Sequence, residues 1–200
     1  MLRAAERVPL PWKNGGGLTR EVAVHPPGSD FAGFEWRVSI AEVRAAGPFS
    51  AFPGVDRSLA VLAGALSLII AGREPLTLGA AAPPAHFPGE LAVSAEPIGG
   101  AVTDLNVMTR RGHWRARMSH TVVHGGVEVG LAEATTLLLA LTPLTLRSGR
   151  TRYALARLDA ALLEGPGRCQ LESVEVPGAL WVIELVTLTR QPPSLLDQTR

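Results

Sequence analysis

Apolar and polar residues alternate in short segments along this chain. The clearest case places Trp36, Val38 and Ile40 on one face of a strand and polar residues on the other. Glycine and proline, 21 and 16 residues respectively, separate such segments throughout. Short apolar segments between turn-forming residues are typical of an all-β sandwich or barrel. We predict strands at 18–24, 36–43, 59–62, 66–70, 91–93, 102–109, 127–131, 136–141, 144–146, 154–158, 161–163, 170–176 and 179–187.

A faint internal repeat accompanies this pattern. The apolar segment 59–78 resembles 137–149, and each precedes a glycine turn and a further pair of strands. Both pairs, at 91–108 and 169–186, have a strand, then an acidic residue with proline and glycine, then a strand. Two copies of one β-module would explain the repeat. We expect a first module with the ligand pocket over 1–118, a second module over 119–190 and a flexible tail over 191–200.

Composition narrows the class of protein. With 200 residues, 46% of them hydrophobic and 18% charged, the chain can bury a sizeable core. Its net charge of +1 gives no reason to expect a nucleic acid or a membrane as partner. The one cysteine, Cys169, excludes a disulfide framework within the chain. The first residues lack an apolar signal-peptide segment, and the apolar segment 59–71 is too short to span a bilayer, so we expect a cytoplasmic protein.

Five motifs carry a specific resemblance. They are PWKNGGGLTREVA (11–23), FEWRVSIAEV (34–43), GPFSAFPGVDR (47–57), FPGE (87–90) and DLNVMTRR (104–111). In this order they resemble the HutD/Ves family of small bacterial proteins, over about 8–188. The resemblance implies an all-β double cupin, in which two RmlC-like jelly-roll β-barrels form one compact unit. It also implies a modulating role in histidine utilisation, since HutD accompanies those operons in some bacteria, but it implies no particular reaction.

The histidines do not follow the pattern of metal-binding cupins. Such cupins use an HxH pair, a glutamate a few residues later and a third histidine on a later strand. The segment after Gly47 has no histidine, and His86 stands alone. His120 and His124 lie in what we expect to be the link between the modules, with no third ligand nearby. We therefore expect no metal and no other cofactor.

The candidate ligand site combines the glycine-rich loop with polar positions on the strands. Consecutive glycines let the backbone approach a small ligand, and Lys13 and Asn14 would supply donors beside it. Lys13 is the only lysine among 19 basic residues, which suggests a positional requirement. Arg20 or Arg37 would hold a carboxylate, because a guanidinium donates two parallel hydrogen bonds to it. The predicted ligand-binding residues are Trp12, Lys13, Asn14, Thr19, Arg20, Trp36, Arg37, Ser39, Ser50 and Arg57.

Other interpretations of these strands stay open. The polar face of each strand could meet water instead of a cavity, and Asp104 and Asn106 alternate with apolar residues in the same way. Asp56 and Arg57 are expected to form a structural ion pair. The two phenylalanines of GPFSAFPGVDR are expected to anchor their loop in the core.

The leading hypothesis is a metal-free binding protein for a small carboxylate or amide, which would modulate catabolism. The resemblance suggests urocanate or a formyl- or formimino-glutamate as the ligand. The alternative is a metal-independent enzyme for the same ligand class, with Glu21 as the base and Lys13 as the acid or stabiliser. A third hypothesis is a structural or protein-interaction role, and a homodimer is compatible with all three.

Overall fold

A computed structural model describes residues 1–12, 15–80, 82–131, 135–173 and 177–188. Lys13 and Asn14, both predicted to bind the ligand, and the tail predicted at 191–200 lie outside these residues. Within them the chain is built from strands, and the one helical element is a single 3₁₀ turn, η1 (Ala4–Glu6). The all-β prediction is confirmed. No helix in this part of the chain is long and apolar enough to cross a membrane.

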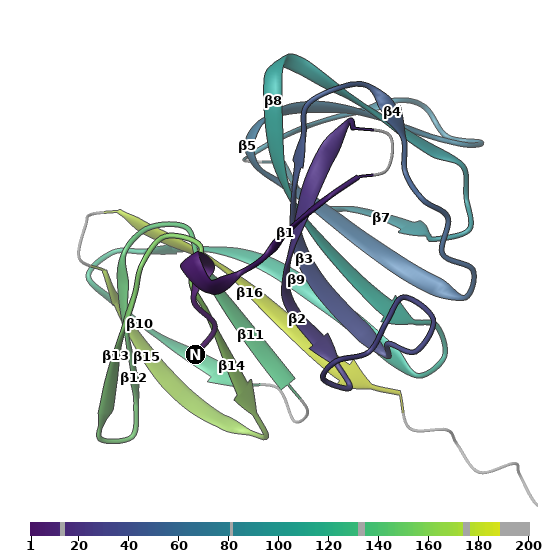
Figure 1. Cartoon of the computed structure of the whole chain (residues 1–200). Coiled ribbons are helices and arrows are strands. Elements are labelled where there is room, and N and C mark those ends of the chain that lie inside the picture. Colours follow the sequence, from purple (N-terminus) through teal and green to yellow (C-terminus); the bar gives the residue numbers. More distant parts are fainter. Residues whose placement is uncertain (13–14, 81, 132–134, 174–176, 189–200) are drawn as a thin grey trace, which may run out of the picture.

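The first module is one antiparallel sheet of eight strands (Figure 1). The strands follow the order β1-β2-β3-β8-β5-β6, with β4 paired to β8 and β7 paired to β5. Their bounds are β1 (Pro9–Pro11), β2 (Gly17–His25), β3 (Trp36–Val43), β4 (Gly47–Pro48), β5 (Val55–Ile70), β6 (Leu76–Gly79), β7 (Ala85–Pro88) and β8 (Val93–Arg110). Leu59, Leu66 and Leu68 are fully buried within one apolar cluster of this module. The sheet therefore encloses a core of its own.

Glycines bend the two long strands of this sheet instead of ending them. We predicted separate strands at 59–62 and 66–70, but both lie in β5, where Gly64 has a φ of 84° and the pairing register shifts. The strand predicted at 102–109 and the last residue of the strand predicted at 91–93 likewise belong to β8, in which Gly99 has a φ of 74°. Irregularities of this kind bend a strand and increase its twist. The sheet can therefore fold over on itself in the manner of a jelly roll.

The second module consists of two four-stranded sheets, β14-β11-β16-β9 and β10-β15-β12-β13. The bounds are β9 (Trp114–Val123), β10 (Gly126–Leu131), β11 (Thr135–Ala140), β12 (Leu144–Ser148), β13 (Thr151–Leu155), β14 (Ala160–Glu164), β15 (Gly167–Ser173) and β16 (Gly178–Thr187). Its interior holds leucines together with Cys169, which is buried. The predicted repeat is wrong in detail, because 91–108 lies almost wholly within one strand while 169–186 runs through two strands of different sheets.

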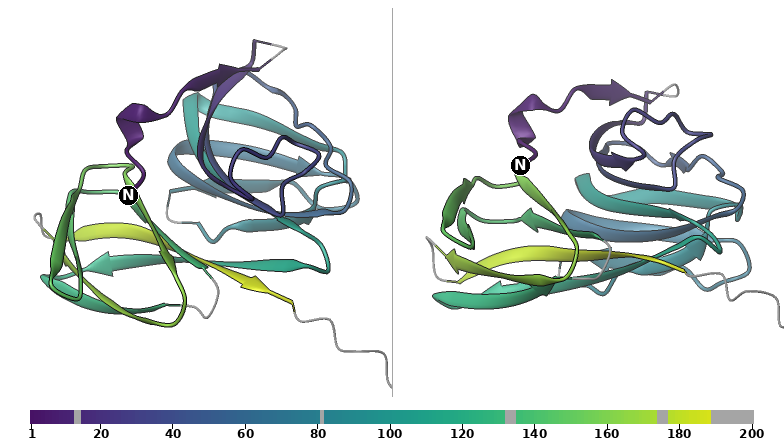
Figure 2. Two further views of the ribbon diagram at one scale, coloured as in Figure 1. Left: turned by 60° about the horizontal axis from the view of Figure 1, so that its bottom comes forward. Right: turned by 90° about the horizontal axis from the view of Figure 1, so that it is seen from below.

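Strand β9 is the long element that the sequence interpretation missed. We expected a link between the modules here, but all ten residues of β9 pair with β16. His120 lies within β9 with its ring centroid 5.4 Å from that of Trp181, whereas His124 follows the end of the strand. In Figure 2 the yellow strand β16 and its neighbour β9 extend from the second module toward the first.

The two modules share a buried core, and this core explains the alternation in β3. Trp36, Val38 and Ile40 pack in one cluster with Trp181 and Ile183 of β16. Burying a side chain of this size stabilises the fold by about 1.5–3 kcal/mol. This face of β3 is therefore committed to the contact between the modules, and Arg37 and Ser39 face the inside of the first module.

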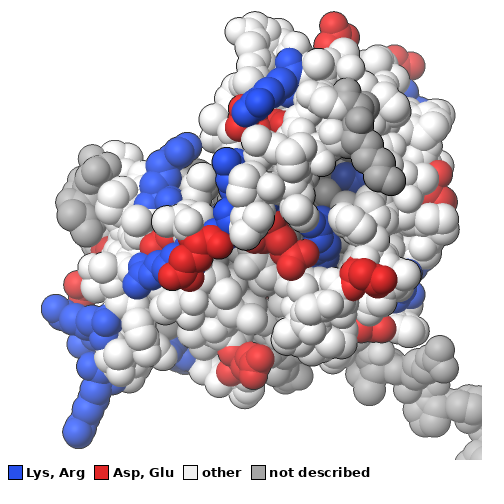
Figure 3. Space-filling model, in the orientation of Figure 1, with Lys and Arg blue, Asp and Glu red and all other residues white. Residues whose placement is uncertain are grey.

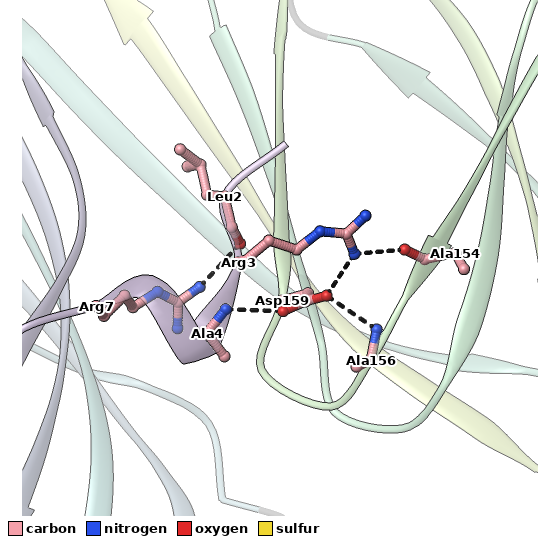
Figure 4. Close-up of polar contacts among 7 residues, drawn as sticks. All are labelled: Leu2, Arg3, Ala4, Arg7, Ala154, Ala156 and Asp159. Carbon is pink, nitrogen blue, oxygen red and sulfur yellow. Dashed lines mark hydrogen bonds and ion pairs between the residues drawn. The ribbon is translucent and has the colours of Figure 1, made fainter.

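The N-terminal segment is tied to the second module (Figure 4). Arg3 Nη1 donates to Asp159 Oδ2 at 2.7 Å, the backbone N–H of Ala4 donates to Asp159 Oδ1 at 2.8 Å, and Leu2 forms a β-bridge with Ala160. Burial alone would raise the pKa of Asp159, but the hydrogen bonds from Ala4, Arg3 and a further backbone N–H hold that pKa below its ordinary value. The first residues thus lie on the second module, although the chain continues from them into β1 of the first.

Candidate functional site

A cavity of about 700 Å³ opens in the first module, on the polar face of β3 and β8. Six of the residues predicted to bind a ligand line it, namely Trp12, Thr19, Arg37, Ser39, Ser50 and Arg57. The other lining residues are Leu10, Pro11, Phe31, Ala41, Pro48, Phe49, Phe52, Leu59, Asp104, Asn106 and Met108. The cavity therefore combines charged groups with aromatic and aliphatic walls, as ligand-binding cavities commonly do.

The floor of this cavity is a sheet surface with three rows of side chains. The pairing register aligns Arg37, Met108 and Arg57 in the first row, Ser39, Asn106 and Leu59 in the second, and Ala41, Asp104 and Val61 in the third. Successive rows are two residues apart along each strand, so all three rows face the same side of the sheet. Both arginines therefore stand at one end of the floor and the carboxylate stands at the other.

Arg57 is held among aromatic rings. Its guanidinium carbon lies 5.1 Å from the ring centroids of both Phe49 and Phe87 and 5.7 Å from that of Phe52. A ring face attracts a cation without cancelling its charge. These contacts place a positive charge at the cavity floor and restrict the orientation of the guanidinium.

The protein satisfies the donors of Arg57 only weakly. Nη1 donates to the Ser50 carbonyl oxygen at 3.3 Å and Nε donates to Asn106 Oδ1 at 3.5 Å, both long for hydrogen bonds. A guanidinium has five N–H donors, so most of its capacity is left for a ligand. Burial lowers the pKa of Arg57 to about 10, although the charge of Asp104 acts in the opposite direction. A buried cation whose N–H donors have few close partners is stabilised by an anion placed against it.

Arg37 has one firm partner, the carboxylate of Glu21. Its Nε donates to Glu21 Oε2 at 2.9 Å, and Nη1 donates to Ser39 Oγ at 3.4 Å. The exposed ring of Phe31 lies 4.9 Å from the guanidinium carbon. Glu21 does not line the cavity. The structure therefore makes Glu21 a partner that orients Arg37 from outside the cavity.

Asp104 is more deeply buried than either arginine, at 1% exposure. Its Oδ1 atom has no hydrogen-bond partner among the described residues. Burial raises the pKa of Asp104 to about 7, against the lowering influence of the Arg57 charge and of a hydrogen bond from the Ala41 backbone. A buried polar atom without a partner is costly, so this oxygen is suited to accept a donor from a ligand.

The glycine-rich motif shapes the rim of the cavity. A Cβ atom on Gly17 would overlap the Glu42 carbonyl oxygen and would lie 3.1 Å from the Trp12 ring. Trp12 in turn donates its indole N–H to Thr19 Oγ1 at 2.8 Å and packs edge-on against Phe49. Glycine at position 17 therefore allows the close backbone approach that seats Trp12 in the cavity wall.

Two predicted ligand-binding residues lie elsewhere. Trp36 belongs to the core between the modules, and Arg20 pairs in register with Ile40, which faces that same core. Neither residue lines the cavity. Lys13 and Asn14 lie outside the described residues, so their predicted roles stay predictions.

The predicted ion pair between Asp56 and Arg57 is wrong. Consecutive residues of a strand point to opposite faces, and both residues lie in β5. Asp56 instead pairs on the outside with Arg111 at 2.7 Å, and Arg111 also binds Glu90 at 2.6 Å. Positive and negative side chains are interspersed over the face shown in Figure 3, and surface pairs of this kind are worth little energy.

Sequence reasoning recognised only part of the lining. Asp104 and Asn106 alternate with apolar residues in the sequence, and Met108 continues the same two-residue period into the cavity lining although it is apolar. Phe31 lies in a loop, where no periodic signal could have identified it. Phe49 and Phe52 anchor their loop against buried clusters as predicted, and they also form part of the cavity wall.

No three His, Cys, Asp or Glu side chains come together as a metal-binding group in the part of the chain that the structure describes. The exposed His86 has its Nδ1 atom 2.8 Å from Ser58 Oγ, outside the cavity lining. The charged groups that the described residues offer to a ligand in the cavity are the two arginines and Asp104.

The fold defines the class of protein as a double cupin with a cavity in its first module. Over 92% of its length the chain superposes on a variant of oxalate decarboxylase from Bacillus subtilis, covering 78% of that chain, with a TM-score of 0.65 at 9% identity. A likeness at this identity concerns the fold alone. The double cupin prediction is confirmed.

Within this class the chain belongs to the HutD family, whose sequence model matches residues 4–181. An uncharacterised 21.2 kDa protein in the hutC 3' region of Pseudomonas putida is 35% identical over 94% of this chain and 97% of its own length. A conserved protein of unknown function from Pseudomonas aeruginosa PAO1 has a TM-score of 0.83 at 32% identity, over 92% of this chain and 96% of its own. HutD from Pseudomonas fluorescens SBW25, in a formate condition, has a TM-score of 0.79 at 28% identity, over 94% and 97%.

Proposed function

We propose that this protein binds a small carboxylate in the cavity of its first module, and that Arg57 and Arg37 hold the carboxylate group. The observation that carries the proposal is the pair of buried arginines in one row of the floor, each 5% exposed. Arg57 forms no ion pair among the described residues. A guanidinium binds a carboxylate through two parallel hydrogen bonds, and the phenylalanines around Arg57 suit the carbon skeleton of a small acid.

The family supports a role in histidine utilisation. One relative lies in the hutC 3' region, and another is named HutD. We propose that the ligand is an intermediate of this catabolism, either urocanate or a formyl- or formimino-glutamate, and that its binding modulates the pathway in the cytoplasm. The proposal needs no metal ion as anchor, because the two guanidinium groups supply the positive charge.

A ligand-induced rise in the melting temperature tests the proposal. A ligand at about 100 times its Kd stabilises the folded state by about 2.7 kcal/mol. For a chain of this size, that energy raises Tm by about 5–10 °C. Each intermediate is added at millimolar concentration to the full chain and recovered for NMR, which should show it unchanged. If none of them raises Tm, the proposal is rejected.

Two arginine variants locate the effect. Arg57→Gln removes the charge from the cavity floor and should abolish the rise in Tm. Arg150→Gln changes an exposed arginine in the turn between β12 and β13 and should leave the rise unchanged. Equal responses of the two variants would place the binding outside this cavity.

One observation favours a second function, an enzyme that works by acid–base chemistry. The pKa of Asp104, raised by burial to about 7, suits proton transfer at neutral pH. The base would then be Asp104, since Glu21 is bound to Arg37 outside the cavity. Conversion of a candidate ligand, followed by NMR and lost in Asp104→Asn, would support the enzyme over the binding protein.

A further inference from the structure

The cavity has opposite chemistry at its two ends. The Arg37 and Arg57 row lies at one end, Asp104 lies at the other, and neutral polar groups of Ser39 and Asn106 lie between them. Along β8 the two end rows are four residues apart, about 13 Å between Cα positions. The side chain of Arg57 extends toward the middle row, because its Nε atom lies 3.5 Å from Asn106 Oδ1, and this shortens the span between the charged groups. A small metabolite can therefore reach both ends.

The Asp104 end is built to receive a donor. Its carboxyl is 1% exposed, its Oδ1 atom has no partner among the described residues, and it belongs to the cavity lining. The neighbouring wall residues Thr19 and Trp12 are hydrogen-bonded to each other at 2.8 Å, with Thr19 Oγ1 as the acceptor. Folded proteins rarely leave a buried oxygen of this kind unmet, and an N–H group or a cationic nitrogen is its natural complement.

We propose that the ligand is amphoteric: its carboxylate binds at the arginine end, and an N–H donor at its other end is accepted by Asp104 Oδ1. This inference rests on the proposed function and narrows it from carboxylates in general to carboxylates that carry an N–H group at the opposite end. A monocarboxylate with an apolar end would leave Asp104 without a partner. A dicarboxylate that has no N–H group and whose second carboxylate reaches this end would place a second negative charge against Asp104, whereas formyl- and formimino-glutamate carry an N–H group besides their two carboxylates.

Matched ligands test the inference on the full chain by titration calorimetry. The rigid pair is urocanate, which is 3-(imidazol-4-yl)acrylate, and 3-(furan-3-yl)acrylate. The two have nearly the same shape, but the furan has no N–H group, because an oxygen and a C–H replace the two ring nitrogens. The flexible set is 5-aminopentanoate, hexanoate and adipate, which share a chain length and differ in the far end. A hydrogen bond to a charged group corresponds to about 10- to 100-fold in affinity. We expect the N–H member of each set to bind tighter by about this factor.

Two variants test which side chain binds each end of the ligand. Asp104→Asn keeps the shape of the side chain and removes its charge, and it should reduce the preference for the N–H member while the furan compound and hexanoate bind as before. Arg57→Gln should weaken all members of both sets alike. Glu74→Gln, at an exposed position between β5 and β6, is the control and should change nothing. Urea unfolding of each variant verifies that it is folded.

The outcomes separate the two proposals. If the imidazole and furan compounds bind the unmodified chain equally well, the N–H inference is overturned and carboxylate binding stands. If Asp104→Asn keeps the full preference, the N–H group is met elsewhere and the inference is again overturned. If no carboxylate of either set binds and the histidine-pathway intermediates also fail, the proposed function itself is rejected.

Discussion

Asp104 should make the stability of the folded protein depend on pH. Its pKa rises from an ordinary 3.8 to about 7 on burial, so the folded state holds the proton more tightly than the unfolded chain. The stabilising contribution of the protonated carboxyl is complete below the unfolded pKa and is lost as pH rises through about 7. At 1.36 kcal/mol per pKa unit, the whole change is about 4 kcal/mol. Arg57 on β5 and Arg37 on β3 share the cavity with Asp104, and the charge of Arg57 limits the shift.

The Asp104→Asn variant isolates this effect, because asparagine has the same shape and does not titrate. We expect the free energy of unfolding of the variant, relative to the unmodified chain, to increase by about 3–4 kcal/mol between pH values of about 4 and 8. Urea unfolding at several pH values measures it, provided that the m-value stays constant. Gly79→Ala, which neither removes nor adds a titratable group, should give a difference that does not change with pH. If the difference in unfolding free energy between Asp104→Asn and the unmodified chain also stays constant with pH, burial does not raise the pKa of Asp104 as described.

Three further substitutions test other features. Gly89→Ala would place a Cβ atom 2.6 Å from the Phe52 carbonyl oxygen and should lower the unfolding free energy by about 1–3 kcal/mol, whereas Gly79→Ala meets no atom within 4 Å and should be nearly neutral. If Gly89→Ala and Gly79→Ala have similar urea midpoints, the close approach of the Phe52 carbonyl oxygen to Gly89 does not require glycine there. Asp159→Ala should cost about 1–3 kcal/mol and speed amide exchange in the N-terminal segment, and unchanged exchange would argue against the tie to the second module. Lys13→Arg should weaken ligand binding in the melting assay, and full retention of binding and stability would make the single lysine a coincidence.

The alternation in β3 predicted which of its residues share a face. It did not predict which part of the protein covers each face. Trp36 and Arg37 were both predicted to bind the ligand, and only Arg37 lines the cavity. A strand exposed on one side would have made the apolar face the inner one. Here both faces are covered, one by the second module and the other by the first module's interior, so the pattern alone could not assign Trp36 to the contact between modules.

The other incorrect predictions follow from strands that begin or end at different residues than predicted. Because β5 begins at Val55 and not at 59, Asp56 and Arg57 are strand neighbours on opposite faces, which rules out their ion pair. The alternation of Trp114, Ala116 and Met118 with arginines was present in β9, but the expectation of a link concealed it. The two-residue alternation in the sequence was enough to mark Asp104 as a candidate for the cavity. That its Oδ1 atom has no hydrogen-bond partner among the described residues depends on how three strands pair in register, which only the folded structure shows.

The tie between the N-terminal segment and the second module has a consequence for synthesis. Ala4 and Asp159 are 155 positions apart in sequence, so the ribosome releases the first long before it makes the second. Domains fold as units, the N-terminal one first during translation. The eight strands of the first module can thus assemble while the residues ahead of β1 still lack their acceptor. Their docking is a late event, and a fluorophore attached near Arg3 would report when a nascent chain has passed position 160 and folded there.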